Sequence, residues 1–249
     1  MSALLPWAAA LAGCGLGRLL LFGHEARRAR RLAADAIAYE RILDDAGPAL
    51  LVVGDSLSVG VGAHRPEHSV AGRIARACPD LTVVNRARCG ARLADVPSQL
   101  EAAPSRRWDA VLMTIGGNDA LARTPDAVLA RDARRAVAAV SAVAPRAVVT
   151  TSANVGGVPI VPWPLTRVLE ARSRAVRDAL HAACDAHRVE FVDFFRPLER
   201  DPFARDPELF FGPDGVHPST ACYELCFRVI EARTGLASAL GASGRVAGS

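Results

Sequence analysis

The stretch LLVVGDSLSVGVG, residues 50–62, decides the fold. Its aliphatic residues run without interruption and then stop at Gly54, Asp55 and Ser56. A short, continuous apolar run is typical of a strand that is buried on both faces of a parallel sheet. In open α/β sheets, ligands bind outside the carboxyl ends of the strands. The stretch therefore predicts a buried strand that carries a hydroxyl group, Ser56, to the edge where ligands bind.

Apolar runs and helical patterns alternate along the chain that follows. Five runs are expected to form strands, at residues 49–53, 81–85, 110–115, 147–152 and 189–194. Helices are expected at residues 68–77, 91–102, 165–187 and 219–233, with a long one between Thr124 and Pro145. Such alternation predicts a doubly wound domain with three layers, α/β/α, around a five-stranded parallel sheet. We place this domain at residues 48–235.

The composition excludes several classes of protein. Of the 249 residues, 51% are apolar and 22% are charged, which indicates one globular domain with extensions rather than a disordered chain. The net charge of +4 is small, and no basic stripe alternates with aromatic residues, so nucleic acid is not an expected partner. The six cysteines form no CxxC pair, and His64 and His68 lack the glutamate of a HExxH zinc motif. No metal site therefore stands out in the sequence.

A separate apolar segment precedes the domain. Residues 3–22, ALLPWAAALAGCGLGRLLLF, carry a single charge, Arg18, and match the ~20 residues that a helix needs to cross a bilayer. We expect residues 1–24 to be a hydrophobic anchor or signal-like segment, 25–47 a charged helical connector and 236–249 a flexible tail. Membrane association through the N-terminal segment follows from this division.

The charges beside this segment bear on its orientation. Arginines cluster directly after it, which favours a cytoplasmic position for the domain. Two alternatives stay open. The sequence Leu11–Cys14 resembles a bacterial lipobox, although the basic start of a secretory signal is missing, and a lipobox or a signal would make the domain periplasmic or secreted. The segment could also be an apolar helix that packs on the domain.

Three familiar catalytic or binding motifs do not fit the first strand. Gly54, Gly60 and Gly62 have the wrong spacing for the GxGxxG fingerprint of a dinucleotide site. A Walker loop needs a lysine, and the sequence has none. The nucleophile elbow GxSxG is missed because Ser58 stands where the second glycine belongs.

The remaining polar residues are those that a nucleophilic serine needs. His217 could act as the base for Ser56, and Asp214, three residues earlier, could bind and orient its ring. Gly90 could present a backbone N–H without a side chain in the way, and Asn118 could add an amide donor. With the amide of Ser56 itself, these donors would form an oxyanion hole. Alone, Ser56 could equally cap a helix.

At this point the sequence resembles the SGNH hydrolases, the GDSL esterase and lipase superfamily. Residues 54–57 read GDSL, Gly90 follows the second strand, residues 116–119 read GGND and residues 214–218 read DGVHP. These four blocks occur in the order typical of that family, and the resemblance covers roughly residues 48–233. It implies a flavodoxin-like sheet with strand order 2-1-3-4-5.

The resemblance also implies the chemistry. Ser56 would be the nucleophile, with His217 as base and Asp214 as orienting acid, and Ser56, Gly90 and Asn118 would form the oxyanion hole. We expect a carboxylic ester hydrolase that acts through an acyl-enzyme, without metal or cofactor, on a small ester or lipid, such as an acyl lipid or a lysophospholipid-like molecule. The alternatives are a carbohydrate O-deacetylase of the same family and a non-catalytic, membrane-tethered binding module. The sequence does not set the oligomeric state.

Substrate contacts are less defined than the catalytic groups. Asn154, at the end of the fourth strand, could meet a substrate or bind its own loop. Trp163, between two prolines, could line an acyl pocket. Five phenylalanines gather near the last loop and could either line that pocket or close the core, namely Phe194, Phe195, Phe203, Phe210 and Phe211.

Overall fold

The computed structural model describes residues 24, 27–29, 31–43 and 47–247. At its centre is a sheet of five parallel strands in the order β2-β1-β3-β4-β5. The strands are β1 (Ala49–Gly54), β2 (Thr82–Asn85), β3 (Ala110–Ile115), β4 (Ala147–Thr151) and β5 (Glu190–Val192). Each lies within two residues of the run that predicted it, and the expected α/β fold with its 2-1-3-4-5 order is confirmed.

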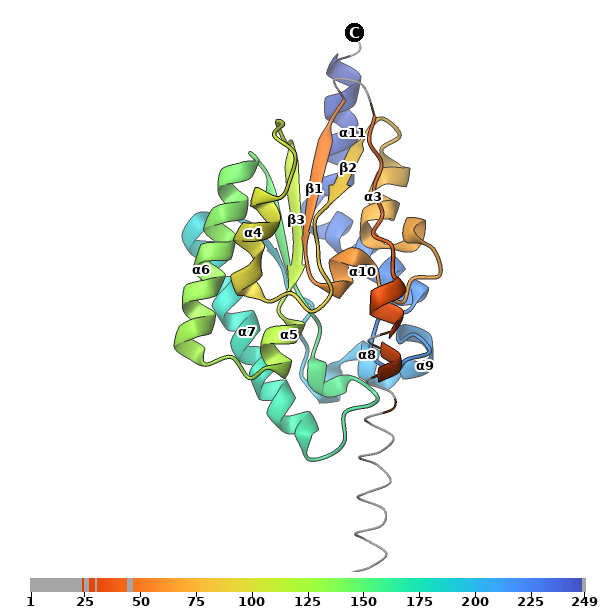
Figure 1. Ribbon diagram of the computed structural model, residues 1–249, viewed down its shortest axis with the longest axis vertical. Coiled ribbons are helices and arrows are strands. Elements are labelled where there is room, and N and C mark those ends of the chain that lie inside the picture. Colours follow the sequence, from red (N-terminus) through yellow and green to blue (C-terminus); the bar gives the residue numbers. More distant parts are fainter. Residues whose placement is uncertain (1–23, 25–26, 30, 44–46, 248–249) are drawn as a thin grey trace, which may run out of the picture.

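Two layers of helices cover the sheet, one on each face (Figure 1). One face carries α4 (Val96–Glu101), α6 (Asp126–Val143) and α7 (Leu165–His187). The other carries α3 (Val70–Ala77), α10 (Thr220–Thr234) and α11 (Leu236–Ala247). Each face of the sheet packs on its helices in a separate hydrophobic core, and alternate residues of β1 belong to the two cores. Leu51 and Val53 face the first layer, and Leu50 and Val52 face the second. This double burial is why β1 is apolar at every position before Gly54.

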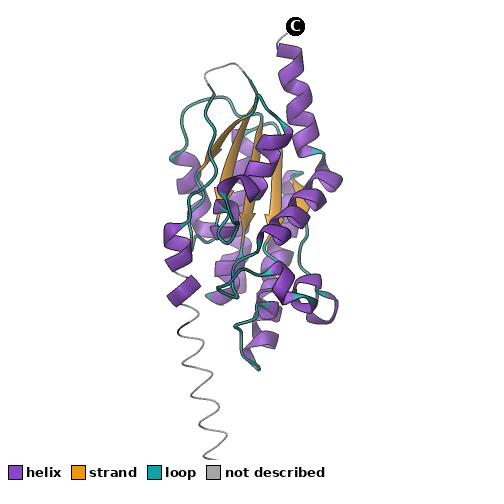
Figure 2. Cartoon of the chain, turned by 90° about the vertical axis from the view of Figure 1, so that its right-hand side faces the viewer, coloured by secondary structure: helices purple, strands orange, loops and turns teal. Residues whose placement is uncertain are grey.

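Short helices form the loops between the larger elements. They are α2 (Ser56–Val59), η1 (Pro66–His68), η2 (Leu93–Asp95), α5 (Gly117–Leu121), η3 (Val155–Gly157), η4 (Leu198–Arg200), α8 (Pro202–Arg205) and α9 (Pro207–Phe210). Because all strands are parallel, the loops that follow them open at one edge of the sheet, the lower end in Figures 1 and 2. We call this edge the carboxyl edge.

The segment before β1 is only partly helical, which corrects the expectation of a helical connector at residues 25–47. Residues 27–29 and 31–35 are helical, but residues 36–40 are not. Arg41 then pairs with Val83 in β2, with N···O distances of 2.9 and 2.7 Å. Its guanidinium also donates to the carbonyl groups of Leu81 and Ala75. Backbone groups at the sheet edge and at the end of α3 thus find partners that sequence periodicity does not reveal.

The C-terminal segment also differs from its expectation. Residues 236–249 were expected to be a flexible tail, yet Leu236–Ala247 form α11. Leu236, Ala237 and Leu240 are buried against the core, and the carboxylate of Glu231 accepts hydrogen bonds from the amides of Ala237 and Ser238. The apolar face of this helix is short and lies among Gly, Ala and Ser, so the sequence resembled a polar tail. Residues 248–249 lie outside the described residues.

The proposed anchor falls in a part of the chain that the structure does not describe. Residues 1–23 are outside the described ranges, so the expected division at residue 24 stays a prediction. Among the helices of the described residues, none is both long enough and apolar enough to span a bilayer.

A glycine at the end of β1 should contribute strongly to the stability of the fold. Gly54 has φ +131°, and a Cβ there would lie 2.0 Å from the carbonyl oxygen of Thr114 in β3. We expect Gly54→Ala to lower the free energy of unfolding by about 2–4 kcal/mol, from backbone strain and from the clash. Gly235→Ala is the control, because Gly235 also has positive φ (+59°) but nothing lies within 4 Å of its Cβ position. Equal losses in urea unfolding would contradict the role of the contact with β3.

Candidate active site

Ser56 sits where β1 turns into the short helix α2. Asp55 caps this helix, since its carboxylate accepts a hydrogen bond from the amide of Leu57 at 2.9 Å. The hydroxyl of Ser58 donates to the carbonyl of Val53 at 2.8 Å and accepts from the amide of Thr114 at 3.2 Å. Ser56 itself is partly exposed at the first position of α2. The hydrogen bonds of Asp55 and Ser58 therefore fix this turn, and Ser56 lies at the carboxyl edge.

His217 and Asp214 form a buried pair in the loop before α10. The ring Nδ1 of His217 lies 2.6 Å from Oδ2 of Asp214, whose side chain is fully buried. The other oxygen, Oδ1, accepts from the amides of Val216 and His217, both at 3.0 Å. Burial alone would raise the pKa of Asp214, but the hydrogen bonds from the His217 ring and the two amides bring that pKa below its ordinary value. An ionised Asp214 holds the proton on Nδ1 and leaves Nε2 of His217 able to accept one.

Close packing joins the His217 loop to the loop of Ser56. Gly62 has φ +91°, and a Cβ there would lie 2.3 Å from the carbonyl oxygen of Pro218 and 3.2 Å from the Cβ of His217. The hydroxyl of Tyr223, in α10, donates to the carbonyl of Val61 at 2.8 Å. These contacts fix the two loops against each other. Ser56 and His217 line the same cavity, and hydrogen bonds between a catalytic serine and its base commonly tighten only when substrate is bound.

Gly90 and Asn118 come from the loops after β2 and β3. The side-chain nitrogen of Asn118 donates one hydrogen to the carbonyl of Ala91 at 3.0 Å, which orients the amide and leaves its second hydrogen to donate elsewhere. Gly90 is exposed and has φ +81°. The carboxylate of Asp119, next to Asn118, accepts from the amide of Leu93 at 3.0 Å and so ties the two loops together. Two amide donors are thereby held beside each other.

One cavity of about 380 Å³ brings the predicted residues together. Ser56, Gly90, Asn118 and His217 line it, and Asp214 lies buried behind His217. The rest of its lining is almost entirely apolar: Ala29, Ala33, Cys89, Leu121, Val155, Val158, Ile160, Val161, Pro162, Leu165, Leu169 and Val216. A hydroxyl, an imidazole and amide donors therefore face a space suited to an apolar group.

The two weaker sequence candidates lie elsewhere. Asn154 is buried; its side-chain oxygen accepts from the amide of Gly156, and its nitrogen donates to the carbonyl of Arg196, both at 3.0 Å. Trp163 is 78% exposed and is not among the described residues that line the cavity. Phe194 and Phe203 line a separate, small hollow beneath α10. The structure thus gives Asn154 loop-stabilising bonds and sets Trp163 beside the cavity rather than in its wall.

The sequence analysis missed most of the cavity wall. Residues 155–165, VGGVPIVPWPL, follow β4 and supply six of the lining residues, and the helical segment before β1 supplies Ala29 and Ala33. The available signal was an apolar run in a loop at the carboxyl edge. Such a run carries no periodicity, so the sequence alone did not distinguish it from core.

Burial of Asp55 gives the site a second unusual carboxyl group. Asp55 is only 2% exposed, and burial raises its pKa to about 7, against lowering effects from the amide of Leu57, the charge of His217 and the amide of Gly116. Burial likewise raises the pKa of Asp119. Of these carboxyl groups near the site, Asp214 is the one bonded to an imidazole. The environment therefore favours Asp214 as the acid that orients His217.

The sequence matches a known protein family over the part of the chain that holds these residues. The model of the GDSL-like lipase/acylhydrolase family matches residues 52–225, which include Ser56, Gly90, Asn118, Asp214 and His217. No curated protein matches the sequence significantly.

Solved structures share the fold. A lipolytic protein of the G-D-S-L family from Veillonella parvula superposes with a TM-score of 0.61 at 16% identity, covering 76% of this chain and 99% of that one. An extracellular lipase from Streptomyces rimosus gives 0.58 at 23% identity, covering 76% and 100%. An acetylxylan esterase from Geobacillus stearothermophilus gives 0.55 at 19% identity, covering 76% and 94%. At these identities the likeness shows the fold alone.

The raised pKa of Asp55 predicts a dependence of stability on pH. Folding raises this pKa from 3.8 to about 7, so the folded protein holds a proton that the unfolded chain has lost between these values. The contribution of Asp55 to the free energy of unfolding therefore falls as the pH rises from about 4 to 7. Asp55→Asn keeps an oxygen that can accept from Leu57 but cannot ionise. We expect its stability advantage over the wild type to grow between about pH 5 and pH 8.

Urea unfolding at both pH values measures this difference. Asp95→Asn is the matched control, because the exposed Asp95 accepts from the amide of Arg92 in a similar local contact. An Asp55→Asn advantage that does not change with pH would show that folding leaves the ionisation of Asp55 unaltered.

Proposed function

The chain belongs to the GDSL-like lipase/acylhydrolase family and is a carboxylic ester hydrolase, and on this premise we propose that it cleaves esters of apolar acyl groups through an acyl-enzyme on Ser56. One observation carries the proposal: Ser56, His217, Gly90 and Asn118 line a single cavity whose remaining wall is apolar. The polar groups supply the chemistry of acyl transfer, and the apolar wall supplies a place for the acyl chain.

The first half of the reaction forms the acyl-enzyme. Nε2 of His217 takes the proton of the Ser56 hydroxyl as Oγ attacks the carbonyl carbon of the ester. The negative oxygen that results is stabilised by the amides of Ser56 and Gly90 and by the side-chain amide of Asn118. The imidazolium is stabilised by the ionised Asp214, 2.6 Å from Nδ1. His217 then gives the proton to the leaving alcohol oxygen, the C–O bond breaks, and the acyl group stays on Ser56.

The second half repeats these steps with water. His217 takes a proton from water as the water oxygen attacks the acyl carbon, and it returns the proton to Oγ of Ser56 as the carboxylic acid leaves. Every proton that moves passes through His217.

The lining of the cavity indicates which class of ester is the better substrate. The cavity has a volume of about 380 Å³ and mostly aliphatic walls, so burial of an apolar acyl chain in it is favourable. The hydroxyl groups of a sugar would lack hydrogen-bond partners there. We therefore favour an acyl lipid or lysophospholipid-like ester over an O-acetylated carbohydrate. Release of acetate from an acetylated glycan at a rate above that of longer acyl groups would favour the deacetylase instead.

We also propose a membrane location. The apolar residues 3–22 would hold the protein at a bilayer, and the arginines that follow them favour a cytoplasmic position for the catalytic domain. Fractionation of cells, combined with protease protection, tests both parts. Release of the full chain into the periplasm or the medium would support a signal or lipobox instead.

Removal of the nucleophile or of the orienting acid should abolish most of the activity. We expect Ser56→Ala to lower kcat for p-nitrophenyl esters by about 10³–10⁶-fold. Asp214→Asn should lower it by about 10⁴-fold, because an amide cannot stabilise the imidazolium and favours the wrong tautomer of His217. Asp201→Asn serves as the matched control and should keep most of the activity, since Asp201 is also buried but accepts from the amide of Phe203 rather than from an imidazole. Substantial turnover by Ser56→Ala would exclude Ser56 as the nucleophile. Failure of a fluorophosphonate to label Ser56 in the folded protein would favour a non-catalytic binding module.

A larger residue in the cavity wall should shorten the preferred acyl chain. Ala33 lines the cavity from the helical segment before β1, and Ala34, its neighbour, is exposed and is not among the lining residues. We expect Ala33→Leu to lower kcat/KM for octanoyl esters about ten-fold while acetyl esters change little, because the added methyl groups occupy space for the chain end. Ala34→Leu should leave the chain-length profile as in the wild type. Equal effects of Ala33→Leu on both esters would place the acyl chain elsewhere.

A further inference from the structure

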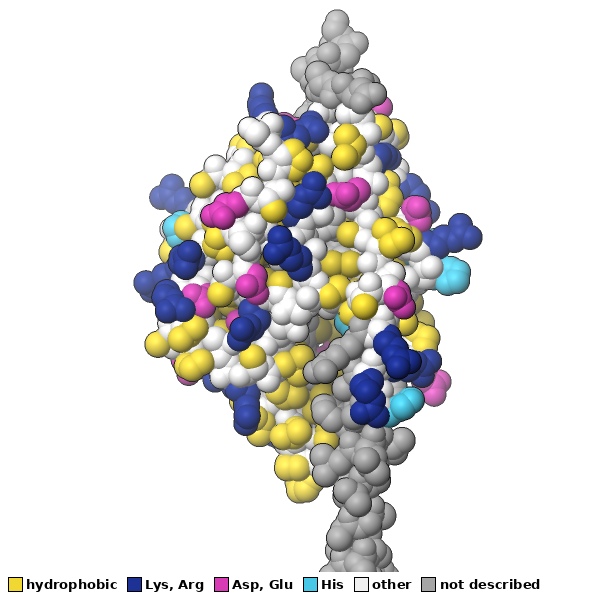
Figure 3. Space-filling model, in the orientation of Figure 1, with side chains coloured by type: hydrophobic (Ala, Val, Ile, Leu, Met, Phe, Trp, Pro, Cys, Tyr) yellow, Lys and Arg dark blue, Asp and Glu magenta, His cyan; other side chains and the backbone are white. Residues whose placement is uncertain are grey.

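Exposed apolar side chains concentrate beside the mouth of the cavity. Leu121 ends α5, Trp163 precedes α7, and Leu165 and Val168 lie on its first turn, with exposed fractions of 52%, 78%, 45% and 42%. Leu121 and Leu165 also line the cavity, and Trp163 and Val168 flank Leu165 in the chain. We call these four residues the apolar rim. In Figure 3, hydrophobic side chains gather at the lower end of the molecule, which is the carboxyl edge.

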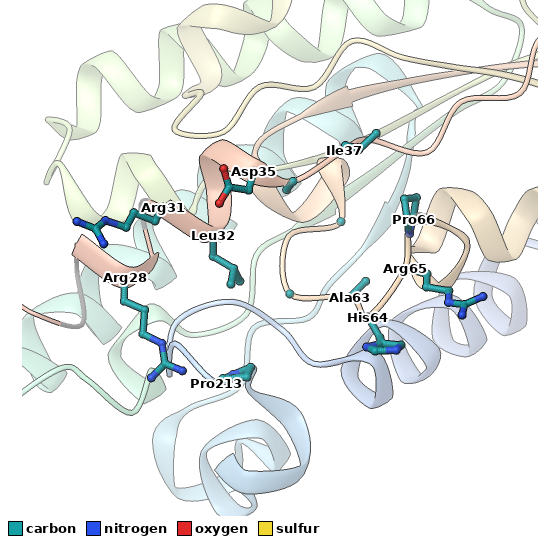
Figure 4. Close-up of a pocket in the computed structure, with 13 residues that line it drawn as sticks. Arg28, Arg31, Leu32, Asp35, Ile37, Ala63, His64, Arg65, Pro66 and Pro213 are labelled. Carbon is teal, nitrogen blue, oxygen red and sulfur yellow. The ribbon is translucent and has the colours of Figure 1, made fainter.

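Basic residues lie across the cavity from the apolar rim. The helical segment that supplies Ala29 and Ala33 to the cavity also carries Arg27, Arg28 and Arg31, all exposed. No ion pair joins these arginines to a carboxylate of the described residues. Figure 4 shows that Arg28 and Arg31 extend from one side of a second hollow, of about 520 Å³, with His64 and Arg65 on its other side. Asp35 is the one acidic residue among its described lining, so the net charge of this second hollow is positive.

The chain enters the domain at this same edge. The apolar residues 3–22 directly precede the segment that carries these arginines, and the first described residues lie at the carboxyl edge (Figure 1). A membrane that held residues 3–22 would therefore lie near the mouth of the cavity rather than near α11, at the opposite end of the sheet.

We propose that the apolar rim and the three arginines Arg27, Arg28 and Arg31 dock on an anionic lipid bilayer, so that the catalytic cavity opens toward the membrane. An exposed indole is suited to the level of the lipid headgroups, and arginines that form no ion pair with a described carboxylate are suited to the lipid phosphates. A second copy of the chain is a poorer occupant, because four side chains are few for a stable dimer, which typically buries ~800 Å² per partner. Docking would let an acyl chain pass from the bilayer along Leu121 and Leu165 into the cavity. This inference rests on the proposed function for its substrate, but not for the docking itself.

Fluorescence of Trp163 tests the docking directly. The full chain is reconstituted in vesicles of phosphatidylcholine and phosphatidylglycerol with brominated acyl chains, and the spectrum of Trp163→Phe is subtracted to isolate Trp163. We expect its emission to fall about two-fold relative to vesicles without bromine. The control is Ile42→Trp in the Trp163→Phe background. Ile42 is 66% exposed and adjoins Leu43, whose amide binds Thr82 at the start of β2, so it lies at the end of the sheet away from the rim. Its tryptophan should not be quenched.

Hydrolysis links the docking to turnover. Val168→Glu places a negative charge in the rim at a residue outside the cavity lining. It should lower turnover of a long-chain ester embedded in anionic vesicles about five-fold and leave that of a water-soluble acetyl ester unchanged, with Ile42→Glu altering neither.

The outcomes separate the two proposals. Soluble-ester turnover with an unquenched Trp163 would overturn the docking and leave the proposed function intact. Quenching of Trp163 without hydrolysis of any ester would uphold the docking and contradict the proposed function. An unquenched Trp163 that is shielded from acrylamide in cross-linked dimers would overturn the docking in favour of a second copy.

Discussion

The site depends on how tightly β1 is fastened to β3 at their carboxyl ends. Gly54 lies against the carbonyl of Thr114 at a distance that admits no Cβ, the amide of Asp55 donates to that same carbonyl at 3.1 Å, and Ser58 bonds both strands. These contacts hold the carboxyl ends of β1 and β3 side by side. Ser56 follows one end and Asn118 follows the other, so a nucleophile and an oxyanion donor are held together by the sheet rather than by flexible loops.

Electrostatics then assigns different tasks to carboxyl groups that the sequence presents alike. Asp55 receives its hydrogen bonds from backbone amides, and burial raises its pKa to about 7. Asp214 is also buried, but an imidazole and two amides hold its pKa below the ordinary value. An ionised Asp214 in contact with Nδ1 fixes the tautomer that His217 needs as a base. Asp55 instead caps the helix that presents Ser56.

Much of the fold could be read from the sequence, because the core of a parallel sheet demands long apolar runs. β3 and α7 begin and end at the predicted residues, and the four motif blocks named the residues that line the cavity or lie behind it. The errors share a physical cause: they depend on contacts between distant segments. Arg41 leaves the helical pattern to pair with β2, and Leu236 packs into a core that the small residues around it do not predict. The apolar wall at residues 155–165 likewise acquires meaning only once Ser56 is known to face it.

The central claim is that Ser56 carries the acyl group during turnover. Mass spectrometry of the intact protein and its peptides, after acid quenching during hydrolysis of p-nitrophenyl butyrate, tests this most directly. The account predicts one butyryl group on the peptide that contains Ser56. A butyryl group on Cys89, which lines the same cavity but whose pKa burial raises, would contradict it, as would steady turnover with no acylated peptide at all.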